Sequence, residues 1–150
     1  MNIIVKGNQL EFNGKVYTCA IGKNGFAQNK REGDNCTPIG TFPIREVFYK
    51  TDRPITNLSC KQINEFDGWC DDVNSDDYNK HIKLLHPARH EKMLRDDNLY
   101  DYVVVIGYND APIEKAKGSA IFMHVAKPGY AGTEGCVALK KEDLLEVLAK

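Results

Sequence analysis

The sequence predicts a mainly β fold, a β-sandwich or barrel with a C-terminal helix and a long loop insertion that carries a short helix. Short apolar, β-branched runs alternate with turn residues through most of the chain, and the clearest amphipathic stretch lies at residues 140–150. Residues 50–100 lack regular periodicity and are rich in Asp, Asn and Pro. A length of 150 residues suits one domain with its own core, so we expect a single domain over 1–150 with the insertion at about 50–100.

Four strands are expected in the first fifty residues, at 2–5, 10–12, 16–21 and 41–49. Asn13-Gly14 separates the second from the third, and Asn-Gly between apolar runs is the strongest short signal for a hairpin. Pro43 indicates that the fourth strand starts irregularly or lies at an edge. The polar, glycine-containing stretch 22–35 is expected to be a surface loop.

The long insertion is expected to carry a short helix at residues 87–95, where Met93 and Leu94 follow several good helix formers. A connection of this length inside a compact domain is usually a lid or a binding insertion. It therefore supplies candidates for substrate contacts.

Three further strands are expected, at residues 102–106, 119–126 and 137–139. The first reads Tyr-Val-Val-Val-Ile and has the β-branched composition of a buried strand. Alternation along the second places Phe122 and His124 on one face and Met123 and Val125 on the other.

The composition excludes several classes of partner. Twenty basic residues against twenty-one acidic ones leave a net charge of −1, so nothing indicates binding to nucleic acid or to an anionic membrane. The first residues, Met-Asn-Ile-Ile-Val-Lys-Gly, do not read as a signal peptide, so we expect a cytoplasmic protein, periplasmic only if a signal was removed. The odd number of cysteines, five, fits a reducing compartment.

A histidine at the end of one predicted strand and a cysteine at the start of the next form a candidate catalytic pair. Cys136 follows His124 by twelve positions across a glycine-containing loop, which lets the side chains meet on neighbouring strands. An imidazole that takes the thiol proton creates the nucleophile and later protonates the leaving amine. Gly135 leaves room for a substrate carbonyl beside backbone amides, which are candidate oxyanion donors. The alternative is a buried structural cysteine and a structural histidine.

Two motifs resemble the L,D-transpeptidase catalytic domain family, of YkuD type. Residues 133–137 read Thr-Glu-Gly-Cys-Val after His124, and residues 37–42 read Thr-Pro-Ile-Gly-Thr-Phe. The resemblance covers essentially the whole chain, and implies a YkuD-like fold with Cys136 as nucleophile, His124 as base and Gly135 beside the oxyanion. It implies peptidoglycan stem peptides or muropeptides as partners. No metal or other cofactor is expected, because the spacing of His81, His86, His90 and Cys70 matches no standard zinc-ligand pattern.

Two departures from the family pattern affect the substrate contacts. Glu134 stands where many members have histidine, and Ala138 stands where many have Arg or Asn. Glu134 either orients groups or binds a substrate amine, or it is an exposed loop carboxylate. The substrate-binding candidates are Thr133, Glu134, Trp69, Asp71, Tyr78, His90 and Arg31. For those in the insertion, the alternative is packing onto the sheet, and for Arg31 a solvated face.

The expected reaction is cleavage of the L,D bond of tetrapeptide stems with release of terminal D-Ala, that is, an L,D-carboxypeptidase of muropeptide recycling, as in a compact, unexported branch of the family. One alternative is an L,D-transpeptidase that forms cross-links or exchanges D-amino acids, and another is a non-catalytic domain that binds wall fragments. Sortases are disfavoured because no arginine follows Cys136. Papain-like enzymes place cysteine before histidine, the reverse of the order here.

Overall fold

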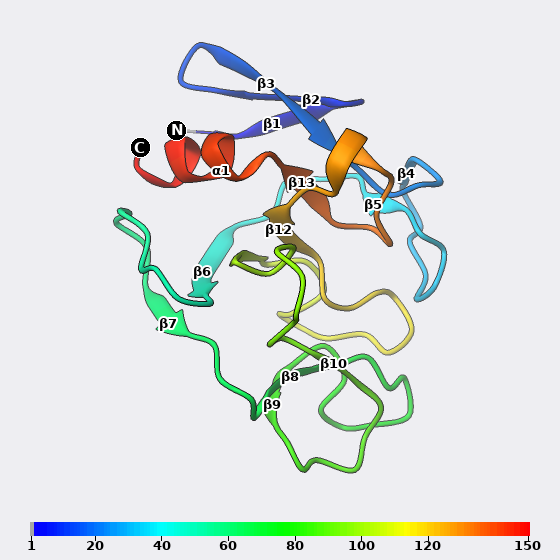
Figure 1. Cartoon of the computed structure of the whole chain (residues 1–150). Coiled ribbons are helices and arrows are strands. Elements are labelled where there is room, and N and C mark those ends of the chain that lie inside the picture. The colour runs from blue at the N-terminus through cyan, green and yellow to red at the C-terminus, as the bar shows by residue number, and fades with distance from the viewer. Residues whose placement is uncertain (1) are drawn as a thin grey trace.

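The computed structural model describes residues 2–150, which form a mainly β domain with one short α-helix near the C-terminus (Figure 1). Eight strands form the main sheet in the order β1-β2-β3-β13-β12-β11-β6-β7. The strands are β1 (Ile4–Lys6), β2 (Gln9–Phe12), β3 (Lys15–Ala20), β4 (Phe26–Ala27), β5 (Thr37–Pro38), β6 (Ile44–Tyr49), β7 (Cys60–Gln62), β8 (Asp67–Cys70), β9 (His81–Lys83), β10 (His90–Lys92), β11 (Tyr102–Ile106), β12 (Phe122–Val125) and β13 (Val137–Leu139). The helices are the 3-10 turn η1 (Pro128–Tyr130) and α1 (Lys141–Leu148). The predicted fold class is confirmed.

The hairpin of β2 and β3 follows from its two turn residues. Asn13 and Gly14 both have positive φ, 53° and 74°, the conformation that a two-residue primed turn requires. Phe12 therefore pairs with Lys15 across the turn, and Leu10 pairs with Tyr17. Leu10 and Tyr17 are buried in the hydrophobic core cluster that also contains Leu139 and Leu144.

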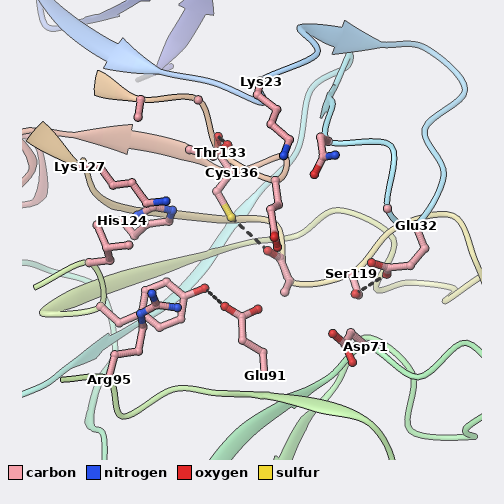
Figure 2. Close-up of a pocket in the computed structure, with 18 residues that line it drawn as sticks. Lys23, Glu32, Asp71, Glu91, Arg95, Ser119, His124, Lys127, Thr133 and Cys136 are labelled. Atoms are coloured by element: carbon pink, nitrogen blue, oxygen red, sulfur yellow. Dashed lines mark hydrogen bonds between the residues drawn. The ribbon is translucent and has the colours of Figure 1, made fainter. Parts of the chain in front are cut away.

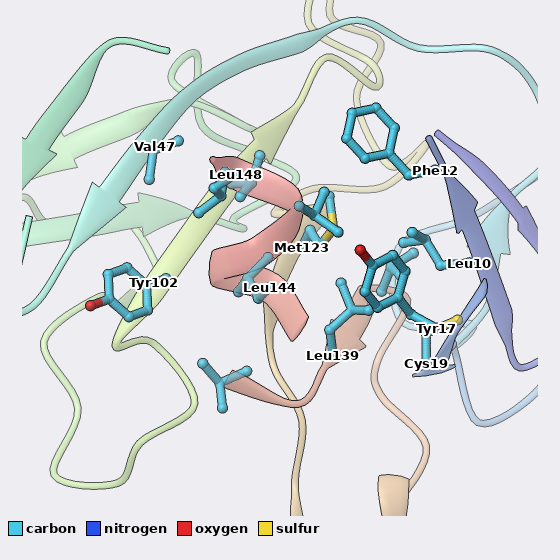
Figure 3. Packing of buried hydrophobic residues seen from close by; sticks show 14 residues of the cluster. Leu10, Phe12, Tyr17, Cys19, Val47, Tyr102, Met123, Leu139, Leu144 and Leu148 are labelled. Carbon is cyan, nitrogen blue, oxygen red and sulfur yellow. The ribbon is translucent and has the colours of Figure 1, made fainter. Parts of the chain in front are cut away.

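The centre of the main sheet is buried on both faces. On one face Met123, Val125 and Leu139 pack with α1 through Leu144 and its neighbours (Figure 3). On the other face Phe122, Val103 and Cys136 form a second cluster with residues of the insertion, among them Trp69, Met93 and Tyr100. The expected alternation along β12 is therefore confirmed, and the insertion covers the face that carries Cys136.

The insertion is a small sheet with loops, and the helix predicted at 87–95 is wrong. Strands β8, β9 and β10 form a three-stranded sheet in the order β10-β8-β9, and His90 pairs with Cys70 in antiparallel register. Met93 is fully buried in the second cluster just after β10. Pairing and burial override the modest helix propensity of this stretch.

The helices formed by residues 2–150 include none that is long and apolar enough to cross a membrane.

We expect Leu144→Ala to lower the free energy of unfolding by about 2–5 kcal/mol, because Leu144 is fully buried between α1 and the sheet. Urea unfolding followed by far-UV circular dichroism measures the change. Leu85→Ala is the matched control, since Leu85 is 99% exposed, and its effect should stay within about 0.5 kcal/mol. Equal losses in both variants would contradict the assignment of the core.

Candidate active site

Two parallel strands place His124 and Cys136 on the same face of the sheet. β12 pairs with β13 so that Met123 lies opposite Val137 and His124 opposite Ala138. Cys136, one residue before β13, lies beside Phe122, whose amide donates to the Cys136 sulfur at 3.4 Å. His124 is two residues from Phe122 and therefore points to the same side. Both side chains line one cavity of about 490 Å³ (Figure 2).

The geometry of His124 suits a general base. Its Nδ1 lies 2.8 Å from the Val125 carbonyl oxygen, which accepts hydrogen bonds only, so in the neutral ring Nδ1 carries the proton and Nε2 has the free lone pair. The Tyr100 ring packs edge-on against the imidazole, with the centroids 5.5 Å apart. Burial lowers the pKa of His124 to about 4, and the nearby charges of Arg95 and Lys127 act in the same direction. The imidazole is thus neutral at pH 7.

The Cys136 thiol is hydrogen-bonded to a backbone carbonyl. Within residues 2–150 it donates to the Ala120 carbonyl oxygen at 3.2 Å, and not to the imidazole. Burial raises the pKa of Cys136 to about 12, and Glu91 and Glu134 add repulsion against the thiolate. The resting pair is therefore a thiol beside a neutral imidazole. Proton transfer to Nε2 requires the thiol proton to leave its contact with the Ala120 carbonyl.

The turn before Cys136 is tightly constrained at Gly135. Its φ is +137°, and a Cβ there would lie 2.8 Å from the Cys36 carbonyl oxygen, so a side chain is excluded on both counts. The Gly135 amide donates to Thr133 Oγ1 at 3.1 Å, and the Thr133 hydroxyl donates to the Cys136 carbonyl at 2.6 Å. Because the Gly135 amide is already engaged, the Cys136 amide is the better candidate for the oxyanion donor.

The Thr-Pro motif in the N-terminal half supports the same turn. The Thr37 hydroxyl donates to the Gly135 carbonyl at 2.8 Å and accepts from the Gly22 amide at 2.9 Å. Thr37 is itself buried. The two sequence motifs thus meet in space, ninety-eight residues apart along the chain.

A buried ammonium group lies beneath the turn. Lys30 is 3% exposed, its Nζ is 2.7 Å from Asp34 Oδ1, and it lies 3.3 Å from the position that a Gly135 Cβ would take. A lysine is rarely buried unless it is paired, and Asp34 supplies the partner. The structure shows a buried ion pair packed against the turn before Cys136.

The cavity brings together five of the predicted site residues. Thr133, Glu134 and Asp71 line it with His124 and Cys136. Glu134 is exposed at its rim, and its charge acts on Cys136 as a repulsion against the thiolate. Gly135, the remaining residue of the predicted catalytic set, does not line the cavity and immediately precedes Cys136 in the turn.

Four other predicted site residues do not line the cavity: Trp69, Tyr78, His90 and Arg31. The Trp69 indole donates to Asn79 Oδ1 at 2.9 Å and packs edge-on against Phe122, which is the packing role weighed as its alternative. Tyr78 is 1% exposed and donates its hydroxyl to Glu32 at 2.7 Å. Both side chains are core residues because the insertion folds onto the sheet.

The remaining two, His90 at the start of β10 and Arg31 in a loop, lie outside the cavity. His90 Nδ1 is 2.9 Å from the Ala88 carbonyl oxygen, a local contact within the insertion. Arg31 is exposed, and its backbone amide donates to Asp34 at 2.8 Å.

Sequence reasoning missed four residues of the insertion that line the cavity: Glu91, Arg95, Leu99 and Tyr100. Tyr100 donates its hydroxyl to Glu91, and the Arg95 guanidinium lies over the Tyr100 ring, 5.2 Å from its centroid. Burial raises the pKa of Glu91 above its ordinary value. In an aperiodic stretch, charged residues look like a solvated surface, so the sequence held no signal that would single these out.

The YkuD family, described as the L,D-transpeptidase catalytic domain, matches residues 2–150. The chain belongs to this family. Neither the curated proteins nor the solved structures gave a significant match. Membership in the L,D-transpeptidase family implies a cysteine enzyme of transpeptidase type that acts on peptidoglycan stem peptides.

Acidification should weaken the L,D-transpeptidase fold through His124. Its pKa is about 4 in the folded chain and ordinarily about 6.5, so the unfolded chain binds more protons between these values and stability falls as pH falls. We expect the free energy of unfolding to fall by up to about 3 kcal/mol between pH 6.5 and pH 4 in the wild type, and not to show this fall in His124→Gln. Urea titrations of both proteins across this range measure it. Parallel pH profiles would show that His124 is not buried as a neutral ring.

Alkylation of Cys136 should be slow at neutral pH and should accelerate steadily with pH. Because its pKa is raised to about 12, the thiolate fraction grows about tenfold per pH unit throughout the range from 7 to 10. Iodoacetamide labelling followed by peptide mass mapping gives the rate at Cys136, and the urea-unfolded chain is the control. A plateau near neutral pH would instead indicate a thiolate–imidazolium pair.

Proposed function

We propose that this L,D-transpeptidase-family domain is an L,D-carboxypeptidase that removes terminal D-Ala from peptidoglycan tetrapeptide stems through a Cys136 thioacyl-enzyme. The observation that carries the proposal is that His124 and Cys136 line one cavity from adjacent parallel strands. Nδ1 of His124 is fixed by a backbone carbonyl, so Nε2 is the nitrogen that acts as base.

The first half-reaction uses the pair and the turn. The Cys136 proton moves to Nε2 of His124 as sulfur attacks the carbonyl carbon of the third stem residue, an L-centre of a diamino acid. The oxyanion of the tetrahedral intermediate faces the Cys136 amide, and the buried Lys30 ammonium beneath the turn adds positive potential there. The carbon–nitrogen bond then breaks, and His124 returns the proton to the amine of the leaving D-Ala.

The second half-reaction is hydrolysis of the thioester. His124 takes a proton from a water molecule as the oxygen attacks the acyl carbon, and Cys136 leaves and regains its proton. The cavity is lined by seven charged side chains: Lys23, Glu32, Asp71, Glu91, Arg95, Lys127 and Glu134. Such a lining is readily hydrated, which favours water over a second stem peptide as acceptor. Cross-linking or exchange of D-amino acids is the alternative outcome of the same acyl-enzyme.

We further propose a reducing compartment, the cytoplasm, as the site of action, with free muropeptides as substrates. All five cysteines are free thiols, and Cys36 and Cys60 are partly exposed. Partly exposed free thiols are typical of proteins kept under reducing conditions.

Incubation with free and disaccharide-linked tetrapeptide, followed by mass spectrometry, tests the reaction. We expect tripeptide and D-Ala from the wild type, and no product above background from Cys136→Ala, because the acyl-enzyme cannot form. His124→Gln should lower kcat by about a hundredfold or more, because the base is lost. Cys60→Ala is the matched control with unchanged activity, since Cys60 lies outside the cavity.

Each other outcome has a distinct meaning. Tetrapeptide dimers, or exchange of D-Ala for an added D-amino acid, would replace hydrolysis by transpeptidation. Release of D-Ala by Cys136→Ala would refute a cysteine mechanism. Binding of the peptide without any turnover would favour a wall-fragment binding domain.

A further inference from the structure

The charges around Cys136 are separated across the cavity. His124, Lys127 and Arg95 lie on one side of the sulfur, and Glu32, Ser119 and Asp71 lie on the other, while Lys23 reaches in from above and Glu91 from below in this view (Figure 2). Besides burial, Arg95 and Lys127 both lower the pKa of His124, against a smaller opposite effect of Asp97, so positive charge prevails at the His124 end. A ligand that spans the sulfur therefore meets a basic end and an acidic end.

Arg95 is held in place with donors to spare. Its Nε and Nη2 donate to the Asp97 carboxylate at 2.9 and 2.7 Å, and its planar group lies over the Tyr100 ring. The Lys50 ammonium donates to the Arg95 carbonyl at 2.6 Å and so anchors the backbone. A guanidinium has five N–H groups, so the Asp97 contacts leave three for a ligand. The Arg95 side chain is 35% exposed and lines the cavity.

The structure of the leaving group determines which part of the substrate lies at this basic end. His124 must reach the amine that departs, so the leaving residue lies on the His124 side of the sulfur. In a leaving group of one amino acid, a single carbon separates that amine from the free carboxylate. The carboxylate therefore lies next to His124, where Arg95 and Lys127 are the charged groups of the cavity lining that oppose it in sign.

We infer that Arg95, with Lys127 beside it, is the receptor for the free α-carboxylate of a single-residue leaving group. The inference rests on the proposed function and names its specificity determinant: the enzyme selects chains that end one residue beyond the cleaved bond. A longer chain or a terminal amide leaves the guanidinium without its anion.

The acidic end disfavours a substrate bound in the reverse orientation, with its C-terminal carboxylate away from His124. Glu32 accepts from Tyr78 and Ser119, at 2.7 and 2.5 Å, and Asp71 accepts from Arg89 at 3.2 Å, so both carboxylates are fixed in place. A substrate carboxylate at this end would face Glu32, which is held by two neutral hydroxyls, whereas Asp71 is paired with Arg89. The side-chain ammonium of the diamino acid, on the acyl side of the cleaved bond, matches this end in sign.

A matched pair of substrates tests Arg95. The tetrapeptide with a free C-terminal carboxylate is compared with the same peptide as C-terminal amide, using kcat/KM for the wild type, Arg95→Gln and Arg53→Gln. Arg53 is an exposed arginine outside the cavity and serves as the control. We expect the wild type and the control to prefer the acid at least tenfold. Arg95→Gln should lower kcat/KM for the acid about ten- to a hundredfold and leave the amide unchanged, as loss of a charge-assisted hydrogen bond predicts.

A binding measurement separates this inference from the proposed function. In Cys136→Ala, which cannot turn over, calorimetry should show tighter binding of the acid than of the amide, and the added Arg95→Gln change should abolish the difference. If the wild type cleaves neither peptide but this binding difference appears, the proposed function fails and the carboxylate receptor stands. Equal losses on acid and amide in Arg95→Gln, or no discrimination in either assay, would overturn the receptor role.

Discussion

The hydrogen-bonded register between β12 and β13 determines where the proposed nucleophile and base lie. Because the strands are parallel and His124 lies opposite Ala138, the cysteine two residues earlier faces the same side as the histidine, diagonally across the ladder. A slip of one residue would turn one of the two side chains into the opposite core, against α1. The apolar residues on that opposite face, Met123 and Val125, therefore hold the chemistry in register by being buried.

Burial of Cys136 and His124 has an electrostatic consequence for the proposed mechanism. The pKa of Cys136 is raised to about 12 and that of His124 is lowered to about 4, so the neutral pair is strongly favoured in the free protein. A thiolate stored in advance is thus not the source of reactivity. Proton transfer has to accompany attack on the carbonyl, and the stabilisation must come from groups aimed at the new oxyanion. The Cys136 amide is the candidate for that role, and Lys30, which is paired with Asp34 below the turn, lowers the pKa of Cys136 against the larger effect of burial.

The sequence predicted the elements whose signal is local and missed what depends on tertiary contacts. Asn13-Gly14 specified a hairpin, and the apolar periods specified β11 and α1 to within a few residues. The helix expected at 87–95 failed because Met93 is buried and β10 pairs with β8, which no local pattern records. In the same way, a conspicuous residue such as Trp69 attracted a binding role, although its indole is engaged by Asn79 in the core.

The residues of the site come from two parts of the chain, and this explains why the sequence predicted one group and not the other. His124, Gly135 and Cys136 belong to the sheet and its turn, where spacing along the chain fixes geometry. Thr37 and Lys30 reinforce that turn from the N-terminal half. Arg95, Glu91 and Asp71 come from the insertion, which folds over the same face of the sheet as the cysteine. With the proposed chemistry on the sheet and the proposed recognition on the insertion, the two can vary separately, so a change within residues 50–100 can redirect which peptide end is accepted without moving Cys136.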